Sequence, residues 1–204
     1  MKKLALIPVV FVMLMWLINI IQFILGIDLG SLGIHPRDTT SLIGILTSPL
    51  IHGNWEHLLS NSLPLLILGV LLFLLYDKIA IWVWLLNYVV TGTLVWLFAI
   101  NSNSFHIGAS GIIYGLASFL FFSGFFRMDI KSIAISFGVG LFYGGMVWGI
   151  LPIQPGVSWE SHLFGGIVGL VLSYLFRNKY RDSSIHAYEE ETTARKTFED
   201  FLKR

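Results

Sequence analysis

Long stretches without a charged residue constrain this chain more than any other feature. Residues 4–27, 57–76, 79–126, 132–159 and 161–176 contain no Asp, Glu, Lys or Arg. A helix that crosses the hydrocarbon core of a bilayer needs roughly 20 apolar residues, which most of these stretches supply. Charged residues make up 12% of the chain, about half of the share in a typical soluble domain. The sequence therefore predicts an all-α, polytopic membrane protein.

The charge-free stretches predict six transmembrane helices. The stretch 79–126 is too long for one span, and the polar residues 101–104 divide it into two. The first span is too long for the apolar part of a signal peptide, so we interpret it as retained. The predicted spans are 4–26, 55–76, 79–100, 109–126, 131–150 and 158–177. Residues 1–177 then form one membrane domain, and residues 178–204 form a charged tail.

The basic residues predict the orientation of these spans. Eight Lys or Arg residues close to the ends of the predicted spans lie on one side of the membrane, and on the other side there is only Arg37. Because basic residues accumulate on the cytoplasmic side, we expect both termini and the tail to be cytoplasmic. The net charge of +1 gives no reason to expect a nucleic acid partner. The absence of cysteine excludes disulfides and thiolate metal sites.

Three polar residues from different spans are predicted to share one depth. Asn61, Ser110 and His162 lie 16, 17 and 15 residues from the cytoplasmic charge that ends their own spans. These separations correspond to about 22–26 Å of helix, inside a core that is about 30 Å thick. Polar residues inside a membrane are costly and are commonly functional. A serine and a histidine in one layer favour nucleophilic catalysis.

Glycines follow both of these residues at helical spacing. Ser110 precedes Gly111 and Gly115, and His162 precedes Gly165, Gly166 and Gly169. Packed helices usually lie 8–10 Å apart, whereas small residues allow their backbones to approach more closely. A hydrogen bond between serine and histidine needs about 3 Å. The two glycine rows therefore favour a contact between the spans that carry Ser110 and His162.

Three motifs occur in order along the chain. They are His52-x4-His57-x3-Asn61 at the second span, Gly108-Ala109-Ser110-Gly111 with Tyr114 in the fourth, and His162-x2-Gly165-Gly166-x2-Gly169 in the sixth. This combination resembles the rhomboid family of intramembrane serine proteases. The resemblance covers roughly residues 4–177. It implies a serine-type endopeptidase whose substrates are transmembrane helices of other membrane proteins. In a bacterium, such a protein would be a multi-pass protein of the inner membrane.

The resemblance also implies roles for individual residues. Ser110 would be the nucleophile and His162 its general base, with Tyr114 packed against the base. His57 and Asn61, together with the Gly108-Ala109 backbone before Ser110, would support the oxyanion. His52 would brace the outer loop. No cofactor or metal is implied. The family's frequent Trp-Arg pair in the first outer loop is missing, because residues 36 and 37 are Pro and Arg.

The remaining acidic and histidine residues bear on the mechanism. Glu56 and Glu160 are expected at the outer helix ends, so that no carboxylate supports the histidine and a Ser–His dyad is favoured over a triad. His106 is expected to be an exposed loop residue.

Three other functions are compatible with parts of the sequence. A metal-dependent protease could use His52, Glu56, His57 and His162, although their spacing departs by one residue from the HxxEH pattern. A catalytically inactive rhomboid-like protein could bind or escort membrane proteins, although such relatives usually lack the serine or the histidine. A small transporter would be expected to show an inverted repeat, and none is visible.

The fifth span and the loop after it are rich in residues that weaken helices. Gly138, Gly140, Gly144, Gly145 and Gly149 are followed by Pro152, Pro155 and Gly156. A helical substrate must enter sideways and unwind, so we interpret this region as a movable gate and cap. A disulfide that locks the fifth span to the second should stop cleavage of a transmembrane substrate. Unchanged cleavage by the locked protein would contradict the gate.

Overall fold

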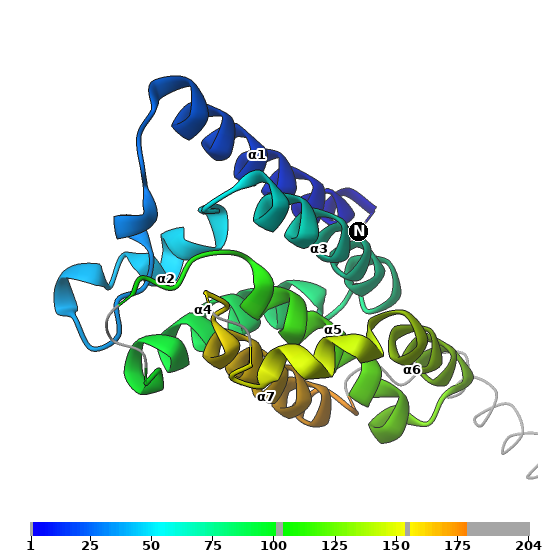
Figure 1. The fold of residues 1–204 in the computed structure, drawn as a ribbon. Coiled ribbons are helices and arrows are strands. Elements are labelled where there is room, and N and C mark those ends of the chain that lie inside the picture. Colours follow the sequence, from blue (N-terminus) through cyan, green and yellow to red (C-terminus); the bar gives the residue numbers. More distant parts are fainter. Residues whose placement is uncertain (1, 101–103, 154–155, 179–204) are drawn as a thin grey trace, which may run out of the picture.

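The computed structural model describes residues 2–100, 104–153 and 156–178, and regular secondary structure in these ranges is helical (Figure 1). The α-helices are α1 Ile7–Leu25, α2 Gly44–Thr47, α3 Trp55–Leu75, α4 Ala80–Phe98, α5 Ser110–Arg127, α6 Ile130–Tyr143 and α7 Trp159–Leu175. The 3-10 helices are η1 Lys2–Leu6, η2 Gly30–Leu32, η3 Thr39–Ser41, η4 Ser48–Leu50 and η5 Gly144–Ile150. The predicted tail lies outside the described residues, except for Asn178.

Five helices within the described ranges are long and apolar enough to cross a membrane. They comprise Leu4–Leu25, Trp55–Leu75, Ala80–Phe98, Ser110–Arg127 and Ile130–Ile150. The prediction of a polytopic helical membrane protein agrees with this finding. The predicted sixth span corresponds to α7, which has 17 residues. Its length of about 26 Å is less than a hydrocarbon core of about 30 Å, so the count of six spans stays a prediction.

The fifth predicted span, 131–150, is not one continuous α-helix. Helix α6 ends at Tyr143, and the chain continues as the 3-10 helix η5. The carbonyl oxygens of Met146 and Gly149 accept hydrogen bonds from side chains of α5 and α7 instead of serving an α-helix. Gly144 and Gly145 at the junction further lower the local preference for α-helix.

Local capping signals set several helix boundaries. Asn54 caps α3 by accepting a hydrogen bond from the backbone N–H of His57, and Asp129 caps α6 by accepting one from Ser132. At the other end of a helix, Gly26 terminates α1 in the left-handed conformation. Helix α5 begins at Ser110, one residue after the start of the predicted span 109–126. The proposed nucleophile is therefore the first residue of its helix.

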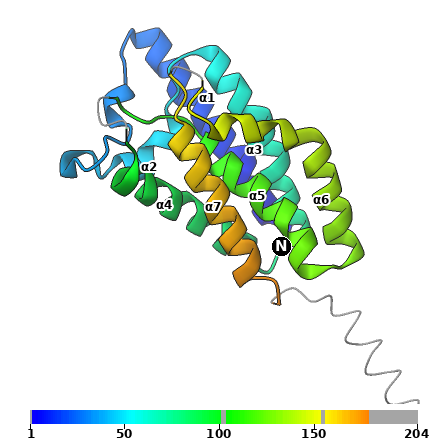
Figure 2. The ribbon, with the colours of Figure 1, turned by 60° about the horizontal axis from the view of Figure 1, so that its bottom comes forward.

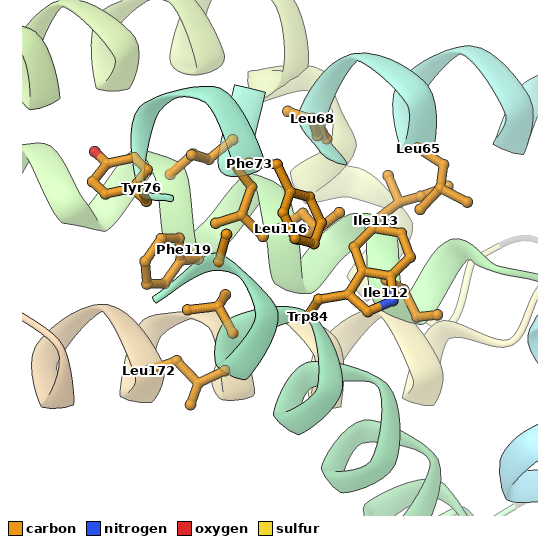
Figure 3. Packing of buried hydrophobic residues seen from close by; sticks show 14 of the residues in the cluster. Leu65, Leu68, Phe73, Tyr76, Trp84, Ile112, Ile113, Leu116, Phe119 and Leu172 are labelled. Atoms are coloured by element: carbon orange, nitrogen blue, oxygen red, sulfur yellow. The ribbon is translucent and has the colours of Figure 1, made fainter. Parts of the chain in front are cut away.

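Helix α5 is the centre of the fold. It contacts α3, α4, α6 and α7, whereas α1 packs on α3 at the periphery. Figures 1 and 2 show α5 beside α7, with α6 on the side away from α4. The buried apolar core surrounds the middle of α5, where Leu116 and Phe119 meet Leu68 and Phe73 from α3, and Trp84 from α4 (Figure 3). This core leaves the polar start of α5 at one end of the bundle.

The backbones of α5 and α7 touch through glycines. A Cβ atom added to Gly165 would overlap the carbonyl oxygen of Gly111, and one added to Gly169 would overlap that of Gly115. The predicted close approach of these two helices is therefore confirmed. Close packing of this kind is a main source of helix association in membranes, where lipid is as apolar as leucine. The contact lies next to Ser110 and three residues after His162.

The long segment between α1 and α3, residues 27–54 (the predicted outer loop), folds against the end of α4. The Arg37 guanidinium donates to the carbonyl oxygen of Ala99 at 2.6 Å, and the Trp96 indole donates to that of Asp38 at 2.9 Å. An arginine from the loop and a tryptophan from α4 thus hold the loop and the helix together. Near the start of α5, the backbone N–H of Gly108 donates to the carbonyl oxygen of Ser48 in the same loop at 2.8 Å.

We predict that Gly165→Ala lowers the free energy of unfolding by about 1–3 kcal/mol, because the added methyl group must push α7 away from Gly111. Thermal and denaturant unfolding in detergent would measure the change. Gly166→Ala is the matched control, since no atom lies within 4 Å of the position of its Cβ. Equal effects of the two substitutions would refute the close contact.

Candidate active site

The side chains of Ser110 and His162 form a hydrogen bond. Ser110 begins α5, and His162 lies in the first turn of α7. The distance from His162 Nε2 to Ser110 Oγ is 2.9 Å, although 52 residues separate them in sequence. The structure therefore brings together the two residues that the sequence singles out. A serine within hydrogen-bond distance of a base is the arrangement from which serine nucleophiles are activated.

The second ring nitrogen of His162 is also bonded. Its Nδ1 atom lies 2.8 Å from the carbonyl oxygen of Gly149 in η5. A carbonyl can only accept, so Nδ1 carries the proton and Nε2 is the acceptor for the Ser110 hydroxyl. This tautomer is the one a general base requires. Because Ser110 and Gly149 occupy both ring nitrogens, no carboxylate bonds the histidine.

Tyr114 packs flat against His162. The two rings are stacked with centroids 4.1 Å apart and planes inclined by 6°. Tyr114 lies one turn after Ser110 on α5, and its hydroxyl donates to the carbonyl oxygen of Met146 at 2.7 Å. The predicted contact between Tyr114 and His162 is therefore confirmed. The tyrosine also holds η5, which carries Gly149, against the site.

His57 and Asn61 lie on the other side of the cleft, on α3. The ring of His57 faces Gly108, where an added Cβ would lie 2.6 Å from the imidazole, and Gly108 has a φ of +100° that favours glycine. Asn61 is 4% exposed and donates its amide N–H to the His57 carbonyl oxygen at 2.8 Å. An amide nitrogen has two hydrogens, so Asn61 keeps one for another acceptor.

His52 is buried next to His57. It is 2% exposed, and the two rings have centroids 4.9 Å apart. Burial lowers the pKa of His52 to about 3, with a further contribution from the neighbouring His57, so His52 is neutral at physiological pH. It precedes α3 in the chain and makes its ring contact with His57. Its burial is compatible with the bracing role that the resemblance implies.

A cleft of about 950 Å³ opens onto these residues. Its lining includes Ser110, His162, His57 and Asn61, together with Tyr114 and Gly149. A cleft with a few convergent polar groups is the usual form of an active or binding site. The cleft lies at the same end of the bundle as the outer loop.

The structure corrects the prediction for His106. This residue is 5% exposed, and its Nδ1 atom lies 2.5 Å from the hydroxyl of Ser158, which in turn lies 2.6 Å from that of Ser161. Its backbone pairs with Ile34 in the outer loop. His106 is thus a buried link between the loop that leads to Ser110 and the helix that carries His162. Sequence spacing offers no signal for a contact across 52 residues.

The acidic residues stand at the helix ends, as predicted. Glu56 and Glu160 lie in the first turns of α3 and α7, and both line the cleft. Glu160 is 3% exposed, a burial that its position at a helix end does not reveal. Within the described part of the chain, no three His, Cys, Asp or Glu side chains form a group that could hold a metal ion, and this includes the residues named for the metal-protease alternative.

Comparison with known proteins agrees with this geometry. The Rhomboid domain family matches residues 39–179. An uncharacterized protein of Mycobacterium tuberculosis is 37% identical over 172 residues, covering 81% of this chain and 72% of the relative. An uncharacterized protein of Mycobacterium leprae is 37% identical over 175 residues, covering 81% of this chain and 68% of the relative. A rhomboid-like chloroplast protein of Arabidopsis thaliana is 28% identical over 158 residues, covering 69% of this chain and 54% of that protein. This integral membrane protein belongs to the rhomboid family.

Proposed function

We propose that this protein is an intramembrane serine endopeptidase that cleaves transmembrane helices of membrane proteins through a Ser110–His162 dyad. The observation that carries the proposal is the 2.9 Å hydrogen bond between Ser110 Oγ and His162 Nε2, with Nδ1 bonded to a carbonyl. In this tautomer the histidine can accept the serine proton at the moment of attack. The family to which the chain belongs includes both active proteases and inactive members, and the intact dyad favours activity.

The residues present suffice for two-step acyl transfer. Ser110 Oγ attacks the scissile carbonyl carbon and gives its proton to His162 Nε2, which then passes it to the leaving amine. A water molecule hydrolyses the acyl-enzyme by the same route, and the serine recovers its proton. The first N–H groups of α5 have no partner within the helix, so the Ser110 backbone can donate to the oxyanion.

Asn61 and His57 supply the remaining oxyanion donors in this proposal. Both line the cleft that contains Ser110. Asn61 has an amide hydrogen left after its bond to the His57 carbonyl. Fixed donors at this position stabilise the tetrahedral intermediate because they need no rearrangement as the charge develops.

In the proposed topology, Ser110 and His162 lie at the same depth in the membrane and the cleft faces outward. Residues 1–177 form six spans, and both termini and the tail 178–204 lie on the cytoplasmic side. In a bacterium, the protein lies in the inner membrane. The distribution of basic residues supports this orientation. The substrate would be a transmembrane helix of another protein in the same bilayer. The span Ile130–Ile150 is the least buried of the five candidate spans. Because few neighbouring residues hold it in place, its low burial favours the proposal that α6 is part of a movable gate.

The second candidate is a catalytically inactive rhomboid-like protein that binds membrane proteins. Its specific support is the cleft itself, whose 950 Å³ can hold a peptide segment whether or not the segment is cleaved. The two candidates differ in what Ser110 does. Binding without cleavage does not require the serine hydroxyl.

We predict that wild-type protein in liposomes cleaves a model transmembrane substrate, whereas Ser110→Ala and His162→Ala lower the rate by at least about 10³-fold. Gel analysis of the products would measure cleavage, and a fluorophosphonate probe should label the wild type but not Ser110→Ala. Full cleavage by either variant would exclude the dyad. Binding without cleavage by the wild type would favour the inactive binder.

We also predict that Asn61→Ala lowers kcat by about 10²–10³-fold with little change in KM, because a lost oxyanion donor affects mainly the transition state. Initial rates in liposomes would separate the two constants. Ser60→Ala is the matched control, since Ser60 lies one residue earlier in the same cleft and its hydroxyl bonds the His57 carbonyl. A wild-type kcat for Asn61→Ala would remove Asn61 from the oxyanion site.

A further inference from the structure

The base of the proposed dyad needs a hydrogen-bond acceptor on its Nδ1 atom. In soluble serine proteases an aspartate fixes the tautomer and orientation of the histidine. Here the acceptor is the backbone carbonyl of Gly149, which lies 2.8 Å from His162 Nδ1. This carbonyl belongs to η5, the 3-10 helix that follows α6, and not to either of the helices that carry the dyad.

Tyr114 connects η5 to the histidine. Its ring stacks on His162, and its hydroxyl donates to the Met146 carbonyl in η5. The imidazole is therefore held on its face by the tyrosine and on its edge by Gly149. Displacement of η5 would remove the Gly149 carbonyl from Nδ1 and the Met146 carbonyl from Tyr114 together.

Position 149 has no space for a side chain. An added Cβ would overlap the Tyr114 hydroxyl and lie 3.1 Å from His162 Nδ1. Gly144 and Gly145 in the same 3-10 helix differ, because their added Cβ atoms would meet nothing within 4 Å. Close approach to the dyad, and not helix flexibility alone, therefore accounts for a glycine at position 149.

We propose that Gly149 is the positioning residue of the base, and that the dyad is competent only while η5 is seated against Tyr114 and His162. This inference rests on the proposed protease function and adds that the position of η5 regulates the activity of the dyad. Since η5 continues directly from α6, any outward movement of α6 that carries η5 with it removes the acceptor from His162. Gate opening and serine activation then alternate instead of occurring together.

The first experiment compares Gly149→Ala with Gly145→Ala in the liposome assay. Gly149→Ala should lower kcat at least tenfold and leave KM within about twofold, because the general base as a whole contributes about 10²–10⁴-fold. Fluorophosphonate labelling of Ser110 should slow in parallel. Gly145→Ala should match the wild type within about twofold. A wild-type kcat for Gly149→Ala would overturn the proposal.

The second experiment weakens the acceptor without adding an atom. Replacing the amide between Gly149 and Ile150 by an ester, with the α-hydroxy analogue of isoleucine, makes the Gly149 carbonyl a poorer acceptor. We expect kcat to fall several-fold, whereas an ester between Gly144 and Gly145 leaves kcat unchanged. Wild-type kcat for the ester at Gly149 would overturn the proposal even if Gly149→Ala is slow.

A double variant tests the link through Tyr114. Tyr114→Phe keeps the stacked ring but removes the bond to Met146, so it should lower kcat on its own. Because both substitutions unseat η5, the loss in Gly149→Ala/Tyr114→Phe should be smaller than the product of the two single losses. If the two losses in kcat multiply, the two substitutions act independently, which would contradict a common effect through displacement of η5. Cleavage by Ser110→Ala would instead overturn the proposed protease function. The failure of that function is therefore distinguishable from the failure of the proposal for Gly149.

Discussion

The contact between α5 and α7 is the constraint on which the site depends. Two helices at the usual 8–10 Å cannot easily place a serine and a histidine within hydrogen-bond distance. Here the Gly111 carbonyl occupies the space where Gly165 would carry a side chain, and Ser110 and His162 lie one residue and three residues from that contact. The 2.9 Å bond of the dyad is thus a local result of backbone packing. Helix association and the assembly of the site cannot be separated.

The glycines between α5 and α7 have no side chains that could orient His162. Other groups therefore orient the histidine. No carboxylate bonds either ring nitrogen, since Ser110 and the Gly149 carbonyl occupy both. The Gly149 carbonyl is a neutral acceptor, and the Tyr114 ring is an apolar surface whose hydroxyl is satisfied by Met146. The proposed base is therefore oriented by uncharged groups, in a chain with only 12% charged residues.

The sequence was informative where a signal is local or periodic. Charge-free stretches predicted the long helices, and the glycines after Ser110 and His162 predicted their contact. The change from α-helix to the 3-10 helix η5 at Gly144 was not predicted, because hydrogen bonds from Tyr114 and His162 on other helices contribute to it. The same holds for His106, whose burial depends on Ser158, 52 residues away. Composition near a residue does not indicate partners that only the fold supplies.

The polar lining of the cleft has a consequence for the proposed substrate. A transmembrane helix satisfies its own backbone hydrogen bonds, and each backbone group left unpaired in hydrocarbon costs several kcal/mol. Unwinding is therefore feasible only where polar groups can replace the lost bonds. The cleft offers such a group in Asn61, whose amide keeps one hydrogen after its bond to the His57 carbonyl, beside Ser110 and His162. Polar residues that would be unfavourable elsewhere in the bilayer thus gather where an unwound segment needs partners, so the cleft favours extended over helical peptide next to Ser110.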